Sequence, residues 1–300
     1  MRDNKRFANN LAVAGVIEAL LMVALIAIVI SLIQLIYIPQ VMEQREAEHM
    51  DAVSNQFSQL KSVIDTQALL GSMEVDAPLE YVPMTSQITM GSDALPYFVS
   101  IPSSGQLSIV EEDDVKITIF PPPGDFPVNG LTLGSIVYDA NNHYFVEQTY
   151  AFEGGGIILN QPEGEHMSVD PSISVENEST KIIINYYLPK IIGIPGKTTH
   201  SSYDEGFIRT NYSSYKTYNA ENITYLRINT TYLDAWNHSL NQNDTGILWE
   251  YVDRGYITFT KDEVGPPPSV EIRPNGKNLW IRLTVVNIYA QIGPGWLDVE

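Results

Sequence analysis

The sequence predicts a mainly β domain, sandwich-like or jelly-roll-like, that follows one long N-terminal helix. An apolar run fills residues 11–38, and an amphipathic helical pattern occupies 39–70. From residue 71 to 300, short β-rich segments alternate with turn residues. We therefore expect a cytoplasmic basic leader (1–10), a transmembrane helix, an amphipathic helical extension and an extracytoplasmic β-rich domain.

The apolar run reads LAVAGVIEALLMVALIAIVISLIQLIYI and is interrupted only by Glu18, Ser31 and Gln34. At 1.5 Å per residue it forms a helix of about 42 Å, longer than the roughly 30 Å hydrocarbon core of a bilayer. A helix buried in a protein core would carry a polar stripe, which this run lacks. The lipid bilayer is therefore its expected partner.

Charges on either side of the run predict its orientation. Arg2, Lys5 and Arg6 precede it, whereas Glu43 and Glu46 follow it. Cationic residues favour the cytoplasmic side, so we expect a single-pass protein of the cell membrane with a cytoplasmic N-terminus and an extracellular C-terminal domain. A cleaved secretory signal would have a shorter apolar core of about 7–15 residues, so we expect this helix to be retained as an anchor.

The extension at 39–70 begins with Pro39, which favours a kink at the membrane interface. Its apolar side chains recur at helical spacings of three and four: Met50, Val53, Phe57, Leu60 and Ile64. Such a stripe has to be buried. We favour packing against the following domain over pairing with the helix of a neighbouring molecule.

Alternating β-rich segments predict the strands of the sandwich or jelly roll, and a second small sheet is left open. Expected strands are Leu107–Val110, Val115–Phe120, Thr132–Tyr138, Tyr144–Tyr150, Gly156–Leu159, Ser172–Val175, Lys181–Leu188, Phe207–Tyr212, Thr224–Thr230, Trp249–Val252, Tyr256–Thr260, Val270–Arg273 and Leu279–Ile292. Asn275-Gly276 predicts a two-residue hairpin between the last two. Residues 232–240 are expected to form a helix that Thr231 caps.

Residues 12–24 read AVAGVIEALLMVA and resemble the N-terminal signature of archaeal type IV pilins, AVSPVIGxxLMVA. The two share Ala-Val, Val-Ile and Leu-Met-Val-Ala, and they differ at Ala14, Gly15 and Glu18. In type IV pilins a basic leader is cut after a small residue, and a glutamate lies near the start of the helix that polymerises. The resemblance implies leader cleavage after Ala14 or Gly15.

The same resemblance implies that Glu18 pairs subunits, so that the chain itself or other pilin-like subunits are partners through the N-terminal helix. The physical alternative is that Glu18 is protonated or reaches the headgroups near the cytoplasmic face. Residues 38–65 and 133–164 are similar to uncharacterised archaeal cell-envelope proteins that carry a β domain behind a pilin-like helix. That likeness covers most of residues 10–245 and implies no activity.

Composition and motifs exclude several classes of function. The net charge of -19 argues against nucleic acid as a partner, and the lack of cysteine excludes thiolate chemistry and Cys-ligated metals. The five histidines have no metal-ligand spacing, and no nucleophile elbow or phosphate loop is present. We expect no enzyme, no metal and no cofactor. The acidic run at 111–114 is better explained as a solvated turn than as a cation site.

Six N-x-S/T sequons crowd into residues 177–243, and none precedes them. The glycosylation candidates are Asn177, Asn211, Asn222, Asn229, Asn237 and Asn243. An Asn- and Thr-rich β surface without glycans is the alternative. Six tyrosines lie within residues 203–232 of this stretch, where they serve either sheet pairing or contact with a glycan or a protein.

These observations together predict a membrane-anchored, pilin-like archaeal surface protein with a structural or adhesive role in the cell envelope or in a filament. The alternative is a tethered β ectodomain that binds a ligand, with carbohydrate recognition favoured, or that is enzymatic. A concave pocket lined by Tyr and Trp with convergent acids would favour this alternative.

Overall fold

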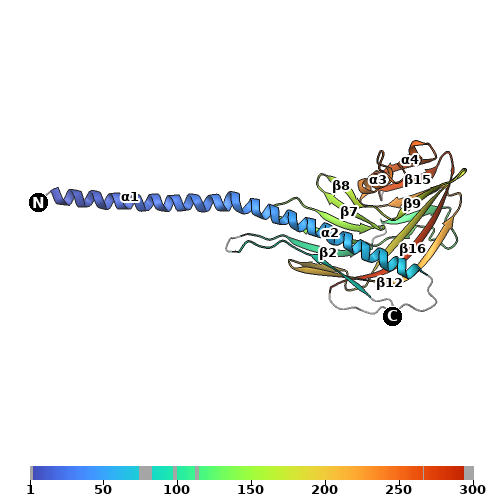
Figure 1. Cartoon of the computed structure of the whole chain (residues 1–300), viewed down its shortest axis with the longest axis horizontal. Helices are drawn as coiled ribbons and strands as arrows, with labels where there is room; N and C mark the ends of the chain where they lie inside the picture. Colours follow the sequence, from blue (N-terminus) through green and yellow to red (C-terminus); the bar gives the residue numbers. More distant parts are fainter. Residues whose placement is uncertain (1–2, 74–82, 97–99, 112–114, 266, 294–300) are drawn as a thin grey trace.

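The structure is a computed structural model in which one long helix leads into a β domain and crosses it (Figure 1). It describes residues 3–73, 83–96, 100–111, 115–265 and 267–293, with side chains from residue 15 onward. The described part confirms the coarse expectation of a long apolar N-terminal helix followed by a mostly β domain.

The helix consists of α1 (Asp3–Leu32), a π-helical turn η1 (Ile33–Tyr37) and α2 (Ile38–Ser72). Pro39 lies in the first turn of α2 and explains the π-helical turn before it. Proline has no N–H and its ring crowds the preceding turn, so regular α-helical bonding is interrupted there. The Ile38 N–H instead bonds to the carbonyl of Ile33, five residues back. The helix therefore continues past the proline.

The described strands form three sheets. Sheet 1 has the order β1 (Met84–Thr89), β12 (Glu205–Ala220), β16 (Asn278–Ile292), β10 (Lys181–Gly193) and β9 (Ile173–Asn177). Its strands are antiparallel except for β10 and β16, which run parallel over their thirteen paired positions. Two long strands at the centre of the sheet are thus brought together from distant parts of the chain.

Sheet 2 is antiparallel, in the order β11 (Thr199–Ser202), β2 (Ser104–Val110), β5 (Ser135–Asn141), β6 (Thr149–Glu153), β7 (Gly156–Gln161) and β8 (Gly164–Val169). Sheet 3 is also antiparallel, in the order β14 (Ile257–Asp262), β15 (Ser269–Pro274), β13 (Tyr225–Asn229), β3 (Lys116–Phe120) and β4 (Leu131–Thr132). Two short helices, α3 (Leu233–Asn241) and α4 (Trp249–Asp253), lie beside sheet 3.

The apolar stripe of α2 forms one side of the first core. Its members Met50, Val53, Phe57, Leu60 and Ile64 are at most 2 % exposed and pack on residues of sheets 1 and 2. The ring centroid of Phe57 lies 6.5 Å from that of Tyr138 and 5.8 Å from that of Tyr150. The prediction that this stripe packs against the chain's own domain is confirmed.

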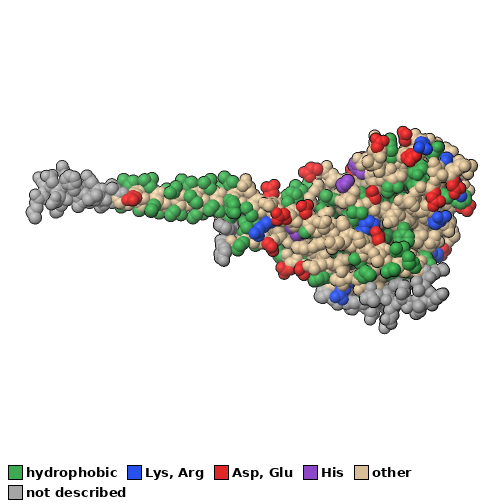
Figure 2. Space-filling view, in the orientation of Figure 1, with side chains coloured by type: hydrophobic (Ala, Val, Ile, Leu, Met, Phe, Trp, Pro, Cys, Tyr) green, Lys and Arg blue, Asp and Glu red, His purple; other side chains and the backbone are tan. Residues whose placement is uncertain are grey.

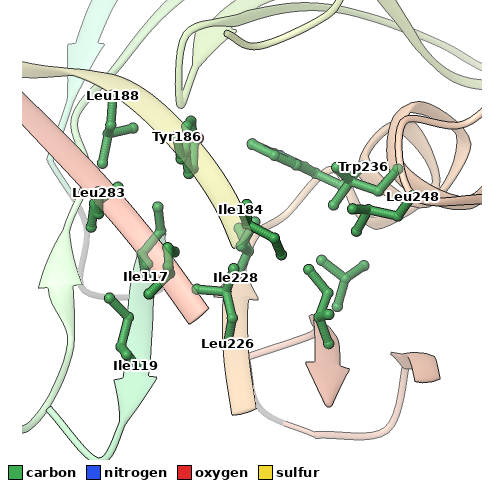
Figure 3. Packing of buried hydrophobic residues seen from close by; sticks show 14 of the residues in the cluster. Ile117, Ile119, Ile184, Tyr186, Leu188, Leu226, Ile228, Trp236, Leu248 and Leu283 are labelled. Carbon is green, nitrogen blue, oxygen red and sulfur yellow. The ribbon is translucent and has the colours of Figure 1, made fainter. Parts of the chain in front are cut away.

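A second core lies between sheet 3, the two short helices and the first halves of β10 and β16. Trp236 of α3 is fully buried there, with Leu248 beside it and Ile184 of β10 facing them (Figure 3). The helix expected at 232–240 is thus confirmed as α3. Thr231 does not cap it, because the N-cap position is Tyr232 and no side chain bonds there.

Three further local predictions were wrong. Residues 249–252 form a helix rather than a strand, since a short apolar run fits either state and the Val252 N–H bonds to the carbonyl of Leu248. The expected strand at 144–150 begins only at Thr149. Asn275-Gly276 makes no hairpin, because β15 joins sheet 3 whereas β16 joins sheet 1.

Glu153 is a fully buried acid where sheets 2 and 3 meet α3. Its Oε1 accepts hydrogen bonds from the hydroxyl of Thr230 (2.6 Å) and the indole N–H of Trp236 (2.9 Å). Burial raises the pKa of the carboxyl above its ordinary value of 4.5, and the hydrogen bonds of Thr230, Trp236 and Ser135 oppose this only in part. The second core is therefore cross-linked by a buried carboxyl group whose pKa is raised by its burial.

We expect a pH dependence of stability from Glu153. Because its pKa is higher in the folded than in the unfolded state, its contribution to the free energy of unfolding is complete below about pH 4.5 and is lost as the pH rises through the folded-state pKa. Glu153→Gln should therefore gain stability relative to wild type as the pH rises from about 4.5 to about 8, measured by urea unfolding in detergent micelles. Glu163→Gln, at an exposed position, should show no such change. The prediction is contradicted by a stability difference between Glu153→Gln and wild type that is the same at both pH values.

Candidate functional site: the exposed apolar helix and its junction with the β domain

The helix from Val16 to Tyr37 exposes its apolar side chains on all faces. Apart from Ile33, which is half-buried, its large apolar residues range from 47 % exposed at Val29 to 76 % at Leu35, and Figure 2 shows a continuous hydrophobic surface that projects from the domain. The helix Gly15–Ser72 is long and apolar enough to cross a membrane, and none of its most apolar window is buried. The fold of the described residues leaves this apolar surface without a partner.

The exposed segment ends where the domain begins. Residues 15–37 extend about 35 Å at 1.5 Å per residue, close to the roughly 30 Å hydrocarbon thickness of a bilayer. Tyr37 is 55 % exposed, whereas Ile38 is 2 % and Met42 is 0 % exposed. No linker therefore separates the apolar segment from the part of the helix that packs into the domain.

Glu46 fastens this junction. Its side chain is fully buried, and its carboxylate accepts hydrogen bonds from three consecutive backbone N–H groups of the loop before β6. Oε2 lies 3.2 Å from the nitrogen of His143, 2.7 Å from that of Tyr144 and 2.7 Å from that of Phe145. These donors are thereby withdrawn from sheet pairing, which explains why the strand expected from residue 144 starts later.

The charge pattern predicts Glu46 only as one of the acids that follow the apolar run, and it does not predict this role. One signal was available, because Glu46 lies four residues after Met42 and four before Met50, in line with the apolar stripe. An acid at a stripe position needs hydrogen-bond donors from the surface on which the helix packs. The identity of those donors, 97 residues away and more, has no local signal in the sequence.

Polar side chains of α2 also fasten the end of β1. Gln56 and Thr89 exchange two hydrogen bonds, from the Gln56 amide to the Thr89 hydroxyl (2.8 Å) and from the Thr89 N–H to the Gln56 carbonyl oxygen (2.9 Å). The Nε2 of His49 lies 3.0 Å from the Thr89 carbonyl. Burial lowers the pKa of His49. Among the described residues no group of three or more His, Asp or Glu side chains is arranged to hold a metal ion.

The residues singled out near the N-terminus lie on the projecting helix. Gly15 faces open space beyond its own helix backbone, whereas the side chains of 1–14, including Ala14, lie outside the described residues. Glu18 is exposed on an otherwise apolar surface with Ile17 and Leu21 beside it. Both positions are accessible, and the structure brings neither close to the β domain.

The six sequons differ in exposure. Asn177, Asn222 and Asn243 are exposed, and Asn211 and Asn237 are half-buried. Asn229 is only 7 % exposed, at the end of β13 where β15 and β3 pair on either side. An attached glycan does not fit the folded surroundings of Asn229.

Most of the acidic run at 111–114 lies outside the described residues, and Glu111 accepts a hydrogen bond from the N–H of Gly193.

A polar groove of about 670 Å³ crosses sheet 2. Five of its lining residues are directly paired across five neighbouring strands and form one transverse row: Ser201, Gln106, Asp139, Thr149 and Asn160. Glu147 adds a second carboxylate, and the described lining includes no Lys, Arg, Tyr or Trp. The groove therefore suits uncharged or cationic polar groups and provides no aromatic stacking surface.

A family model matches most of this chain. The family model described as a family of unknown function, DUF7289, matches residues 12–263. The chain belongs to the DUF7289 family. No curated protein and no solved structure matches it.

The DUF7289 match includes the apolar helix, Glu46 and the loop that Glu46 binds, and it ends before β15 and β16. The junction thus lies within the family region, whereas the long central strand of sheet 1 lies beyond it.

We expect Glu46→Gln to loosen the junction of this DUF7289 chain. The variant replaces a charged acceptor of three N–H groups with a neutral amide, which should cost about 1.5–3 kcal/mol of unfolding free energy. Hydrogen exchange of the amides of 143–145 should become faster. Glu48→Gln is the matched control, because Glu48 is exposed and bonds to Gln44 on the same helix; it should change stability by less than about 0.5 kcal/mol. Unchanged exchange in Glu46→Gln would show that the carboxylate does not hold the loop.

Proposed function

We propose that this chain is a single-pass, membrane-anchored, pilin-like archaeal surface protein with a non-catalytic structural or adhesive role in the cell envelope or a filament. The observation that carries the proposal is the helix Gly15–Ser72, half exposed and apolar and half built into the core of the β domain. An exposed apolar surface of this extent requires lipid or other helices around it.

Three features support the pilin-like form of this proposal. The exposed segment resembles the archaeal pilin signature, Glu18 is accessible for pairing near its start, and the second half of the helix is fixed to a β domain. A rigid connection of this kind transmits the position of a helix directly to the domain. The acids that follow the segment favour an extracellular domain, where the exposed sequons are accessible for glycosylation.

Membrane fractionation with N-terminal mass spectrometry of the native protein tests both the membrane anchor and the pilin-like form. We expect the protein in carbonate-washed membranes or in sheared filaments, with an N-terminus at Gly15 or Val16. Glu18→Ala should reduce its amount in filaments, whereas Gln34→Ala, at the other end of the same apolar run, should not. An intact Met1 in membranes with no protein in filaments would leave a static anchor and exclude the pilin form; recovery in the soluble fraction would exclude the anchor itself.

Ligand binding by the β domain is the second candidate, and the transverse polar row of sheet 2 favours it. Hydroxyl, amide and carboxylate groups on one surface match the hydroxyl groups of an uncharged oligosaccharide. The absence of Tyr and Trp from the described lining means that recognition would depend on hydrogen bonds alone.

We expect any neutral oligosaccharide that binds on a glycan array to lose about tenfold or more in affinity with Asp139→Ala, because a hydrogen bond to a charged group contributes about 1.5–3 kcal/mol. Glu221→Gln, an exposed acid outside the groove, is the control. An array without binding, or equal affinity of both variants, would count against this candidate.

A further inference from the structure

The connection between β1 and β2 lies at the end of the domain from which the apolar helix leaves. Its two described arms run back alongside α2 toward α1 (Figure 1). Arg45 of α2 holds the first arm, donating from Nη1 to the carbonyls of Asp93 (3.1 Å) and Ala94 (3.0 Å). Arg45 is eight residues past Tyr37, about 12 Å along the helix axis. The connection therefore starts close to the exposed apolar segment and extends toward it.

Hydrogen bonds between the two arms fix their conformation. The Ser92 N–H donates to the Ser103 hydroxyl (2.8 Å), and the Ser103 N–H donates to the Ser92 hydroxyl (3.0 Å). Farther out, the Leu95 N–H donates to the hydroxyl of Ser100 (2.9 Å). These bonds fix the first arm up to residue 95 and the second arm from residue 100. The exposed side chains of the two arms therefore have a defined position.

The arms expose apolar side chains. Residues 95–102 read LPYFVSIP, in which Ser100 is the one polar residue besides the tyrosine; of these, 97–99 lie outside the described residues. Ile101 is 58 % exposed, and Pro96 is also exposed. An isoleucine in this position is unfavourable in water and favourable in the apolar part of a membrane interface.

The junction places this surface at the membrane if α1 spans one. Tyr37 and Ile38 mark an abrupt change from exposed to buried helix, so the domain sits directly against the membrane surface. The exposed side chains nearby that carry charge include Glu43 and Glu48, which anionic headgroups repel. Contact with lipid would therefore depend on apolar insertion rather than on electrostatic attraction.

We propose that the two described arms of the β1–β2 connection, residues 90–96 and 100–103, form a second membrane contact, which inserts Ile101 into the boundary between headgroups and acyl chains of the leaflet next to the domain. This inference rests on the proposed membrane span. A single spanning helix leaves the domain free to rotate about the helix axis, whereas a second contact beside it fixes which face of the domain meets the membrane.

Single-cysteine labelling of the full chain tests the inference, because the protein has no cysteine of its own. An environment-sensitive fluorophore is attached at Ile101→Cys, at Leu25→Cys in the span, or at Val264→Cys. Val264 is 91 % exposed in the β14–β15 connection, three residues after Lys261 of β14, which bonds to Asp234 of α3. Each protein is reconstituted into phosphatidylcholine vesicles that carry a lipid quencher either near the headgroups or deep in the acyl chains.

We expect the Ile101 label to lose fluorescence with the shallow quencher, the Leu25 label with the deep quencher, and the Val264 label with neither. Adding Ile101→Asp to a chain labelled at Pro96→Cys should abolish shallow quenching of that label, whereas adding Val264→Asp should not.

Quenching at Leu25 without quenching at Ile101 would overturn the second contact and leave the span intact. A blue-shifted Ile101 label that lipid quenchers do not reach would indicate a protein neighbour and also overturn it. Absence of quenching at Leu25 would overturn the span, and the inference with it.

Discussion

The organisation of this protein depends on a helix that passes from an exposed apolar environment into a protein core without interruption. Tyr37 and Ile38 are neighbours in the chain, yet one is half exposed and the other is buried. A proline at such a boundary would ordinarily end or bend a helix, and the π-helical turn before Pro39 absorbs it instead. Since there is no linker, the direction of the apolar segment is determined by how α2 packs between sheets 1 and 2.

Apolar packing and polar contacts have different parts in that arrangement. The stripe that contains Phe57 supplies the buried area, but a smooth apolar surface alone permits a helix to slide or rotate by a turn. The hydrogen bonds of Glu46 to three backbone N–H groups form at only one position of α2 relative to the β domain. The same is true of the paired bonds between Gln56 and Thr89. These contacts lie on the part of α2 that follows the exposed apolar segment, where a small shift of the helix would change the position of the domain relative to that segment.

Local patterns predicted the parts of the fold that local physics determines. The apolar run, the stripe on α2 and the helix α3 follow from periodicity within a few turns of helix. The roles of Glu46 and Glu153 depend on donors up to 99 and up to 83 residues away in the sequence, which no spacing reveals. The same holds for the polar row of sheet 2, whose members come together only through the register of five strands. Asn275-Gly276 does separate two strands, but the sheet that the next strand joins is determined by long-range tertiary contacts rather than by the turn.

The place of β16 in sheet 1 has a consequence for biogenesis. This strand lies between β12 and β10 and contributes Val286, Ile288 and Ala290 to the core under α2. During synthesis from the N-terminus, α2 is complete more than 200 residues before β16. The apolar stripe of α2 therefore stays partly uncovered until β16 has been made. The first core closes only late in folding, and a chaperone or another apolar surface is the natural temporary cover for the stripe until then.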